Sequence, residues 1–495
     1  MRQIGPELEV ADRSVYARAV ARFRDAGIVL PTFGQLADPG SIPADIKTRL
    51  ETVDADTPHP ANLFRTHWYN GRGTAYALPR PEHVVLPVEL TGVEAPIVVL
   101  LGDRFPMIHS HKVIAAYGCL APRIVSGRFD PGGQRAVWPS TGNYCRGGVA
   151  ISRIMGSRGV AVLPEGMSRE RFEWLAAWVN DPADIIRTPG TESNVKEIYD
   201  RCAELEGEPD TVVFNQFSEF ANHVAHYLLT GRAVDDVFGA MHLADPGLRL
   251  AGFISATGSA GTIAAGDYLK ERHGSLTVAV EALECPTLLR NGYGEHNIQG
   301  IGDKHVPLIH NVMATDIVVG ISDRATDSLF VLFGSDAGRE HLRTHMGVPE
   351  ALIVALPSFG ISSICNILAA IKVAHKQRLG PRDVLVTVAT DGAEMYASEV
   401  ARIVDRDHAG RFDQAAAARV SAAYLDTIDT SDVLVCGPEE RERMFNLGYF
   451  TWVEQRGVPL DAFEARRSQA FWAETRGAAG AWDAMIAAFN AEVAV

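Results

Sequence analysis

Short apolar runs alternate along the chain with longer stretches in which apolar positions recur at helical spacing. The runs have the length and β-branched content of buried strands, and they lie at residues 96–101, 136–138, 159–163, 211–214, 248–254, 276–280, 316–320 and 384–388. Helix-like segments separate most of them. This alternation predicts an α/β fold with largely parallel sheets flanked by helices, in which ligands bind at the loops after the strands.

The most apolar stretch of the chain, residues 351–373, is too interrupted to cross a membrane. Pro357 and the turn-forming residues 360–363 divide it into two parts. We therefore predict a strand, a turn and a buried helix in this stretch.

One loop between a predicted strand and a predicted helix contains mostly small residues. The strand at 248–254 leads into Ser255-Ala256-Thr257-Gly258-Ser259-Ala260-Gly261-Thr262, and helix-forming residues follow as far as Gly274. Small side chains let backbone N–H groups approach an anion, and the positive end of the helix dipole favours its charge. The loop predicts a phosphate site, although an ordinary turn without a ligand would fit the same residues.

Two earlier segments add candidate chemistry. Lysine is scarce in this chain, yet Lys112 stands at the start of an Ala-rich pattern that predicts a buried helix. After it comes a second polar loop, Ser140-Thr141-Gly142-Asn143-Tyr144, which opens onto an apolar helical stretch. The chain therefore has three candidate site segments, namely Lys112 and the two loops, and each lies just before or at the start of a predicted helix.

These segments, in this order, resemble the fold type II pyridoxal-phosphate enzymes, the family of cysteine synthase, cystathionine β-synthase and threonine dehydratase. Lys112 resembles the Schiff-base lysine of that family, 140–143 its Ser/Thr-x-Gly-Asn loop, and 258–262 its Gly-rich phosphate loop. Two further segments match family motifs: Asn215-Gln216-Phe217 with Asn222-His223, and His296-Asn297-Ile298-Gln299-Gly300-Ile301-Gly302.

The resemblance implies pyridoxal 5′-phosphate as the cofactor and a small amino acid as the substrate. It gives Lys112 the catalytic role and the covalent link to the cofactor, and it gives Asn143 a hydrogen bond to the ring hydroxyl. The cofactor phosphate would rest on Gly258, Ser259, Ala260, Gly261 and Thr262. The substrate carboxylate would meet Ser140, Thr141 and Gly142, while Tyr144 either touches the substrate or packs in the core.

The chain departs from the family pattern near its pyridine-binding segment. Where the family has Pro-Ser-Ser-Gly, this chain has Ala389-Thr390-Asp391-Gly392, so Thr390 and Asp391 compete for the pyridine nitrogen. A hydroxyl leaves that nitrogen largely neutral, whereas a carboxylate would keep it protonated and make the ring a stronger electron sink. Asp391 is otherwise a turn residue before Gly392.

Other departures surround the lysine and the second loop. His109 and His111 replace the usual residues before Lys112, and we interpret His111 as structural because adjacent side chains point in different directions. Ala260 stands where the family favours glycine. Arg146 either binds an acidic substrate group or is solvated at the start of a helix.

The family fold implies two lobes, as in the β subunit of tryptophan synthase. Residues 1–104 plus 241–420 would form the large cofactor-binding lobe, and 105–240 a smaller mobile lobe that carries Lys112 and the Asn143 loop. Residues 421–495, with Trp452, Trp472 and Trp482, predict a helical C-terminal extension.

The activity implied is β-elimination or β-replacement on an amino acid with a leaving group on its β-carbon. A racemase would use the same residues, and a non-catalytic pyridoxal-phosphate-binding regulatory protein stays open because the approach to the lysine is altered. A nucleotide-binding oxidoreductase is disfavoured, since no G-x-G-x-x-G precedes an acidic residue at the required spacing.

Composition sets further bounds on partners and compartment. The chain has 495 residues, 47% hydrophobic and 22% charged, so it can bury a large core, and its net charge of −15 argues against nucleic acid or an anionic membrane as main partner. Six cysteines lack the spacing of a metal site, and the N-terminus lacks a signal-peptide pattern. We expect a cytoplasmic enzyme without a metal, and the resemblance implies a homodimer.

Overall fold

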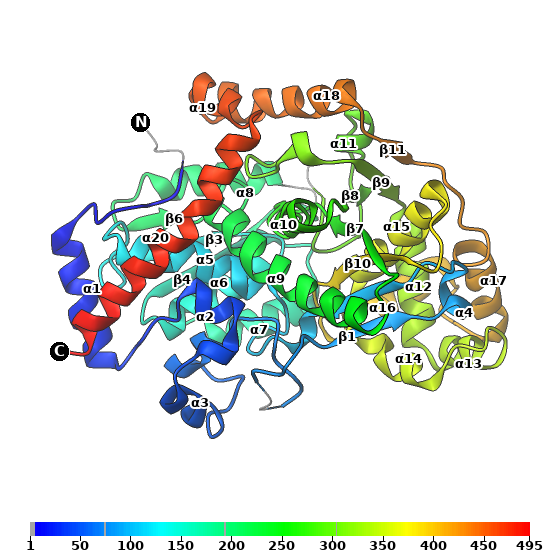
Figure 1. Cartoon of the computed structure of the whole chain (residues 1–495), viewed down its shortest axis with the longest axis horizontal. Helices are drawn as coiled ribbons and strands as arrows, with labels where there is room; N and C mark the ends of the chain where they lie inside the picture. Colours follow the sequence, from blue (N-terminus) through cyan, green and yellow to red (C-terminus); the bar gives the residue numbers. More distant parts are fainter. Residues whose placement is uncertain (1–4, 74–75, 193–194, 303) are drawn as a thin grey trace.

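The computed structural model describes residues 5–73, 76–192, 195–302 and 304–495, in which the strands form two separate sheets (Figure 1). The larger sheet has the order β1-β2-β10-β7-β8-β9-β11. Its central strands are parallel, whereas β1 and β11 pair antiparallel at the two edges. The strand bounds are His83–Leu86 (β1), Ile97–Leu101 (β2), Arg249–Ala256 (β7), Leu276–Ala282 (β8), Ile317–Ile321 (β9), Asp383–Ala389 (β10) and Val433–Val435 (β11).

The smaller sheet is entirely parallel and has the order β5-β4-β3-β6. Its strands are Arg135–Pro139 (β3), Arg158–Pro164 (β4), Ile185–Thr188 (β5) and Thr211–Val213 (β6). Parallel strands require crossover connections, and helices supply them in both sheets.

The α-helices surround both sheets. They are α1 (Arg13–Ala26), α2 (Phe33–Ala37), α3 (Ala44–Leu50), α4 (Val88–Thr91), α5 (Lys112–Val125), α6 (Asn143–Ile154), α7 (Arg169–Trp178), α8 (Val195–Glu206), α9 (Phe220–Ala244), α10 (Ala264–His273), α11 (Thr287–Arg290), α12 (Asp323–Gly334), α13 (Asp336–Thr344), α14 (Glu350–Ala355), α15 (Ile361–Gln377), α16 (Ala397–Asp407), α17 (Gln414–Tyr424), α18 (Pro438–Tyr449), α19 (Leu460–Ala465) and α20 (Gln469–Val493). Gly274 ends α10 in the left-handed conformation, as its sequence predicts.

Both faces of the larger sheet are buried, which explains its continuous apolar strands. Successive residues of β2 alternate between two cores. Val98 and Leu100 join the core that includes α5 and α9, whereas Ile97, Val99 and Leu101 join the core that includes α12 and α15. This packing fixes the carboxyl edge of the sheet, where the loops described below emerge.

Eight of the predicted strands were confirmed, whereas the strand predicted at the start of 351–373 was wrong. The strands β1, β5 and β11 are additional. Residues 350–355 form the short helix α14 instead of a strand, with Leu352 and Ile353 buried. A short apolar run fits either structure, so tertiary packing decided the outcome.

The C-terminal segment is mainly helical, and it also contributes the edge strand β11. Its last helix, α20, runs beside α1 and packs on α2, α5 and α9 (Figure 1). Trp452, Trp472 and Trp482 are buried, and each indole N–H donates to a backbone carbonyl oxygen, those of Val306, Arg466 and Glu7. The extension is therefore an integral part of the folded core.

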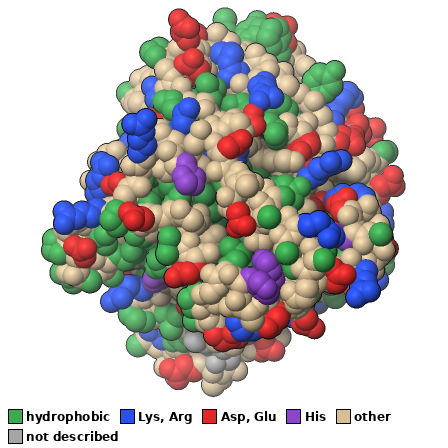
Figure 2. Space-filling model, turned by 90° about the vertical axis from the view of Figure 1, so that its right-hand side faces the viewer, with side chains coloured by type: hydrophobic (Ala, Val, Ile, Leu, Met, Phe, Trp, Pro, Cys, Tyr) green, Lys and Arg blue, Asp and Glu red, His purple; other side chains and the backbone are tan. Residues whose placement is uncertain are grey.

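Charged side chains of both signs are interspersed over the face shown in Figure 2. Within the described ranges, no helix combines the length and the apolar character needed to span a bilayer.

Candidate active site

The predicted site residues come from loops at the carboxyl ends of neighbouring strands. The loop 258–262 follows β7, and Thr390 follows β10, which pairs with β7 in parallel. Ser140 follows β3 of the smaller sheet, and Lys112 begins α5. The topology therefore brings together four segments that are distant in sequence.

Lys112 lies in the middle of this arrangement. Its side chain is buried, and its Nζ donates a 3.4 Å hydrogen bond to Oγ of Ser259. Lys112 lines two small cavities. One is lined by Lys112, Ser255, Ala256, Gly258, Ala260, Thr262, Gly300, Ile301, Asn366, Val388 and Thr390. The other is lined by Lys112, Ser140, Thr141, Asn143, Tyr144, Gln216, Phe217, Gly258, Ser259, Gly300, Ile301 and Gly302.

The loop 258–262 has the form of an anion cradle. The backbone N–H groups of Ser259, Ala260 and Thr262 are buried and have no hydrogen-bond partner among the described residues. A Cβ atom on Gly261 would lie 2.1 Å from Oδ1 of Asn222, so a larger residue would force Asn222 or the loop to shift. Ala260 has a φ of 62°, a conformation that favours glycine, so the residue that departs from the family pattern is held under strain.

His111 is structural, as we interpreted it from the sequence. Its ring is buried, stacks on Trp68 and contacts Oγ1 of Thr262 through Nε2 at 2.9 Å. Burial lowers the pKa of His111 to about 3, so the ring is neutral. His111 therefore joins the start of the lysine helix to the end of the phosphate loop.

The loop that follows β3 is held by a carboxylate that the sequence analysis missed. Oε1 of Glu192 accepts hydrogen bonds from the hydroxyl of Thr141 and, at 2.6 Å, from the N–H of Gly300. Burial raises the pKa of Glu192 to about 7. Ser140 Oγ accepts a 3.0 Å bond from the N–H of Gly142. No motif surrounds Glu192, and only the fold brings it to this loop.

Asn143 and Asp391 are direct partners. The Asn143 amide donates to Oδ2 of Asp391 at 2.7 Å, and the Tyr396 hydroxyl donates to the same oxygen at 2.7 Å. Burial raises the pKa of Asp391, and the Arg171 guanidinium opposes that shift. Asp391 lines neither lysine cavity, whereas Thr390 lines the first. Of the two residues that compete for the pyridine nitrogen, only Thr390 therefore lines a cavity beside Lys112.

Two buried arginines extend this network. Arg146 donates to Oδ1 of Asn143 at 3.0 Å and to the carbonyl oxygen of Ile108 at 2.9 Å. Arg171 donates to the Tyr396 hydroxyl at 3.0 Å and to Oε1 of Gln299 at 2.7 Å. Arg146 is therefore buried and bonded within the protein, contrary to the solvated alternative, while binding of an acidic substrate group stays a prediction.

Tyr144 both packs and borders a cavity. Its ring is buried at 5.4 Å from that of Trp138 in an edge-to-face arrangement, and the residue also lines the second cavity. The two readings of the sequence are therefore compatible.

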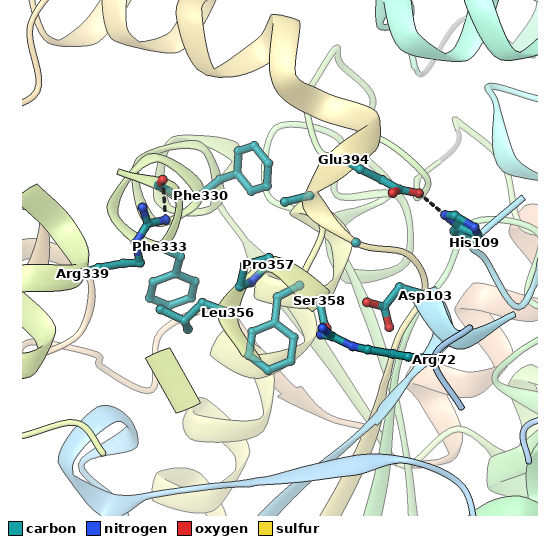
Figure 3. A pocket seen from close by; sticks show the side chains of 14 residues that line it. Arg72, Asp103, His109, Phe330, Phe333, Arg339, Leu356, Pro357, Ser358 and Glu394 are labelled. Atoms are coloured by element: carbon teal, nitrogen blue, oxygen red, sulfur yellow. Dashed lines mark hydrogen bonds and ion pairs between the residues drawn. The ribbon is translucent and has the colours of Figure 1, made fainter. Parts of the chain in front are cut away.

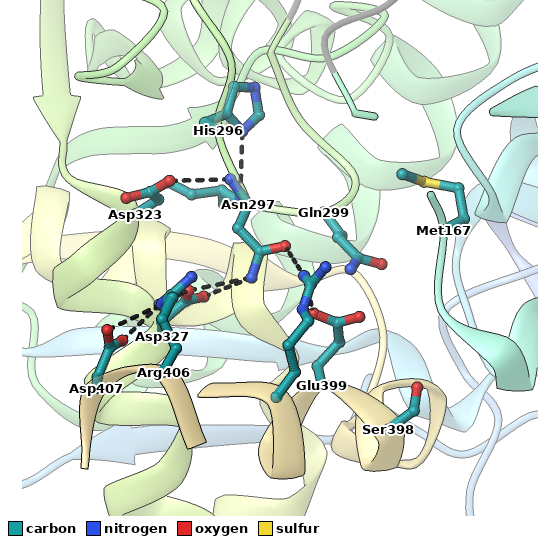
Figure 4. Close-up of polar contacts among 12 residues, drawn as sticks. Met167, His296, Asn297, Gln299, Asp323, Asp327, Ser398, Glu399, Arg406 and Asp407 are labelled. Atoms are coloured by element: carbon teal, nitrogen blue, oxygen red, sulfur yellow. Dashed lines mark hydrogen bonds and ion pairs between the residues drawn. The ribbon is translucent and has the colours of Figure 1, made fainter. Parts of the chain in front are cut away.

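The segment 296–302 is fixed from behind by an ionic network (Figure 4). The Asn297 amide donates to both carboxylate oxygens of Asp327 at 3.0 and 3.1 Å, and its backbone N–H donates to Asp323. Arg406 donates to Asp327 at 2.8 Å. These contacts hold Gly300 and Ile301 against both lysine cavities.

A larger hollow of about 460 Å³ lies beside Glu394, away from Lys112 (Figure 3). Apolar side chains such as Phe330 and Phe359 form one wall, and His109 contacts Glu394 across its polar side at 2.5 Å. The hollow contains none of the predicted site residues. The buried amine therefore places the candidate site at Lys112.

The residues at Lys112 fit pyridoxal phosphate. The unpaired N–H groups of 258–262 suit a phosphate, and the buried primary amine faces the same loop. The polar residues Ser255, Asn366 and Thr390 also line the cavity.

No family model matches the chain, but individual relatives do. Cysteine synthase of Staphylococcus aureus (strain N315) is 29% identical over 274 residues, which are 55% of this chain and 78% of that protein. A probable cysteine synthase of Bacillus subtilis (strain 168) is 29% identical over 295 residues, covering 58% and 84%. Cystathionine beta-synthase of Saccharomyces cerevisiae is 29% identical over 209 residues, 40% of each chain.

Solved structures share the fold. A hydrogen sulfide-producing enzyme from Fusobacterium nucleatum aligns with a TM-score of 0.53 and 22% identity, covering 72% of this chain and 95% of that one. A cysteine synthase from Entamoeba histolytica aligns with a TM-score of 0.53 and 22% identity, covering 70% and 93%. The chain therefore shares the fold of these cysteine synthase-like structures and is similar in sequence to cysteine synthases.

Proposed function

We propose that this chain catalyses β-elimination or β-replacement on an amino acid with a leaving group on its β-carbon. The observation that carries the proposal is the placement of the Lys112 amine between the phosphate-type loop and the Ser140–Asn143 loop. The named cysteine synthase relatives support this reaction class, and nothing in the comparisons supports the racemase alternative.

Several residues of this chain would hold the cofactor. Gly258, Ser259, Ala260, Gly261 and Thr262 would bind its phosphate through backbone N–H groups. Lys112 would hold it covalently, Asn143 would hydrogen-bond its ring hydroxyl, and Thr390 would meet its pyridine nitrogen, because Thr390 lines the lysine cavity and Asp391 does not.

When bound, pyridoxal phosphate supplies an electron sink for negative charge at the substrate α-carbon. Lys112 Nζ would take the α-proton as that C–H bond breaks, and the β-substituent would leave with the electron pair of its bond. Addition of a nucleophile to the β-carbon would then give a new amino acid. Hydrolysis in its place would give a 2-oxo acid and ammonia.

Ser140 would be the main side chain that binds the substrate carboxylate. The Thr141 hydroxyl donates its proton to Glu192, so it can offer only lone pairs to the cavity, and the Gly142 N–H is bonded to Ser140 Oγ. The Ser140 hydroxyl and the N–H groups at the start of α6 remain as donors. The resemblance implies that Ser140, Thr141 and Gly142 all contact the carboxylate, whereas, within the described part of the chain, the hydrogen bonds leave only Ser140 of these three with a free side-chain donor.

We also propose the two-lobed organisation given by the family pattern. Residues 105–240, which contain the whole smaller sheet, would move against 1–104 plus 241–420, and contacts such as Asn143–Asp391 would form between the two parts. The buried free cysteines are compatible with a reducing cytoplasm. A cytoplasmic homodimer is proposed on the family resemblance, and sedimentation of the purified chain tests the dimer.

The experiment that tests the activity is incubation of the purified, cofactor-loaded protein with a panel of β-substituted amino acids. Each substrate is supplied with and without a thiol or sulfide nucleophile. We expect release of a 2-oxo acid, or formation of a new β-substituted amino acid, from at least one substrate. Exchange of the α-hydrogen with inversion and no loss of the β-substituent would overturn the proposal in favour of a racemase.

A further inference from the structure

The C-terminal helix α20 contacts the helix that follows the phosphate loop. Arg476 of α20 forms a buried ion pair with Asp267, which lies in the first turn of α10. The same guanidinium also contacts Glu271 and lies over the ring of Tyr227 at 4.7 Å. We infer that Arg476 is a positioning residue for the cofactor, because it neutralises an acidic group placed at the start of the phosphate-binding helix.

The contact is part of a buried network at the start of α20. Asn311 donates to Oδ2 of Asp267 at 2.8 Å, and Asn311 and Gln469 exchange hydrogen bonds at 3.0 and 3.1 Å. His223 lies 4.0 Å from Asp267, and its Nε2 accepts a 3.4 Å hydrogen bond from Nε of Arg476. Arg476 and Asp267 each have only 5% of their side chains exposed. Water therefore screens this pair weakly.

The physical reason lies in the sign of the charges. The start of a helix attracts a phosphate because its N–H groups and dipole are positive there. Asp267 follows Thr262 by one turn and a half, so an unneutralised carboxylate would oppose the phosphate across a short, poorly screened path. Arg476 cancels that charge, which keeps the field at the loop favourable to an anion.

Other groups near Asp267 do not replace Arg476. His223 is neutral, because burial and the neighbouring Arg476 lower its pKa well below the usual value. Lys270 is on the same helix, but its Nζ binds Asp316 at 2.6 Å. Glu271 adds a second negative charge and pairs with the same guanidinium. The extension thus supplies the cation that the phosphate-binding helix needs.

This inference rests on the proposed cofactor, and its test measures cofactor binding instead of turnover. Cofactor-stripped full-length protein is titrated with pyridoxal phosphate, and the dissociation constant is followed by protein fluorescence. We expect Arg476→Met to raise the dissociation constant roughly tenfold or more. Asp267→Asn should leave it unchanged or lower it, and the double variant should return to within about threefold of the wild type.

A matched control is Arg272→Met, since Arg272 pairs with Asp235 near the other end of α10. We expect no change in cofactor affinity for this variant. Weaker binding by Asp267→Asn, or a double variant as weak as Arg476→Met, would show that the pair acts only as a packing contact and would overturn the inference. If Arg476→Met does not fold, the Asp267→Asn result alone decides. A wild-type protein that binds no pyridoxal phosphate would instead refute the proposed function.

Discussion

The amide of Asn143 donates a 2.7 Å hydrogen bond to the carboxylate of Asp391, and this contact joins the start of α6 to the segment that follows β10. Tyr396 donates to the same carboxylate oxygen. Oδ2 of Asp391 thus holds two other side chains, while the neighbouring residue Thr390 borders the lysine cavity. We therefore propose that these adjacent residues divide a structural task and a cofactor-facing task.

Substitution separates these two tasks. Asp391→Ala should lower the free energy of unfolding of the cofactor-free protein by about 2–4 kcal/mol, because buried donors of Asn143 and Tyr396 lose their acceptor. Thr390→Val, which removes only a hydroxyl, should leave unfolding within about 1 kcal/mol and lower turnover at least about tenfold. Urea unfolding and turnover of both variants provide the comparison. A turnover effect for Asp391→Ala alone, with Thr390→Val fully active, would reverse the assignment.

The cradle after β7 makes a steric prediction. Gly261→Ala would place a Cβ 2.1 Å from Oδ1 of Asn222, which is bonded to the loop, so we expect the loop to shift and the affinity for pyridoxal phosphate to fall at least about tenfold. Gly274→Ala is the control, since Gly274 caps α10 with a positive φ and has open space around it. The control should cost about 1 kcal/mol of stability and leave cofactor affinity unchanged. Unaltered cofactor binding by Gly261→Ala would contradict the placement of the phosphate.

The direction of hydrogen bonds in the second loop predicts unequal roles for two neighbouring hydroxyls. Ser140→Ala should raise KM for the amino-acid substrate about tenfold, because Ser140 retains a donor for the carboxylate. Thr141→Val should raise KM by less than Ser140→Ala does, since the Thr141 hydroxyl already donates its hydrogen bond to Glu192. Steady-state kinetics with one substrate measure both. A larger increase in KM for Thr141→Val would mean that the Thr141 hydroxyl does not donate to Glu192 in the working enzyme.

Glu192 gives a pH-dependent contribution to stability. Its pKa rises from 4.5 to about 7 on burial, so the folded chain binds a proton that the unfolded chain releases between these values. The free energy of unfolding therefore falls as pH rises through this window, by about 3 kcal/mol for this group. Glu192→Gln removes the titration while keeping an acceptor for Thr141 and Gly300.

Chemical unfolding of wild type and Glu192→Gln at pH 5 and pH 8 tests this contribution. The variant should gain stability relative to the wild type as pH increases, with most of the change below pH 8. A constant difference between the two proteins would show that Glu192 does not titrate in this range.

Local patterns predicted the strands and the loops that carry the site, since strand length, small residues and helix starts are local properties of the chain. They could not predict that Asn143 pairs with Asp391, because Asp391 reaches it only when β3 and β10 are in place. Glu192 and Arg171 are ordinary polar residues in sequence and become significant only through burial. The same holds for Arg476, whose effect depends on where α20 docks.

The most direct test of the central claim is chemical trapping of the cofactor on its lysine. The purified protein is incubated with pyridoxal phosphate and reduced with borohydride, and its peptides are then analysed by mass spectrometry. We predict a phosphopyridoxyl group on Lys112 in the wild type and its loss in Lys112→Ala, with Lys372→Ala labelled like the wild type, since Lys372 pairs with Asp429 at the surface. Specific labelling of another lysine, or no labelling of the wild type, would contradict the assignment of Lys112.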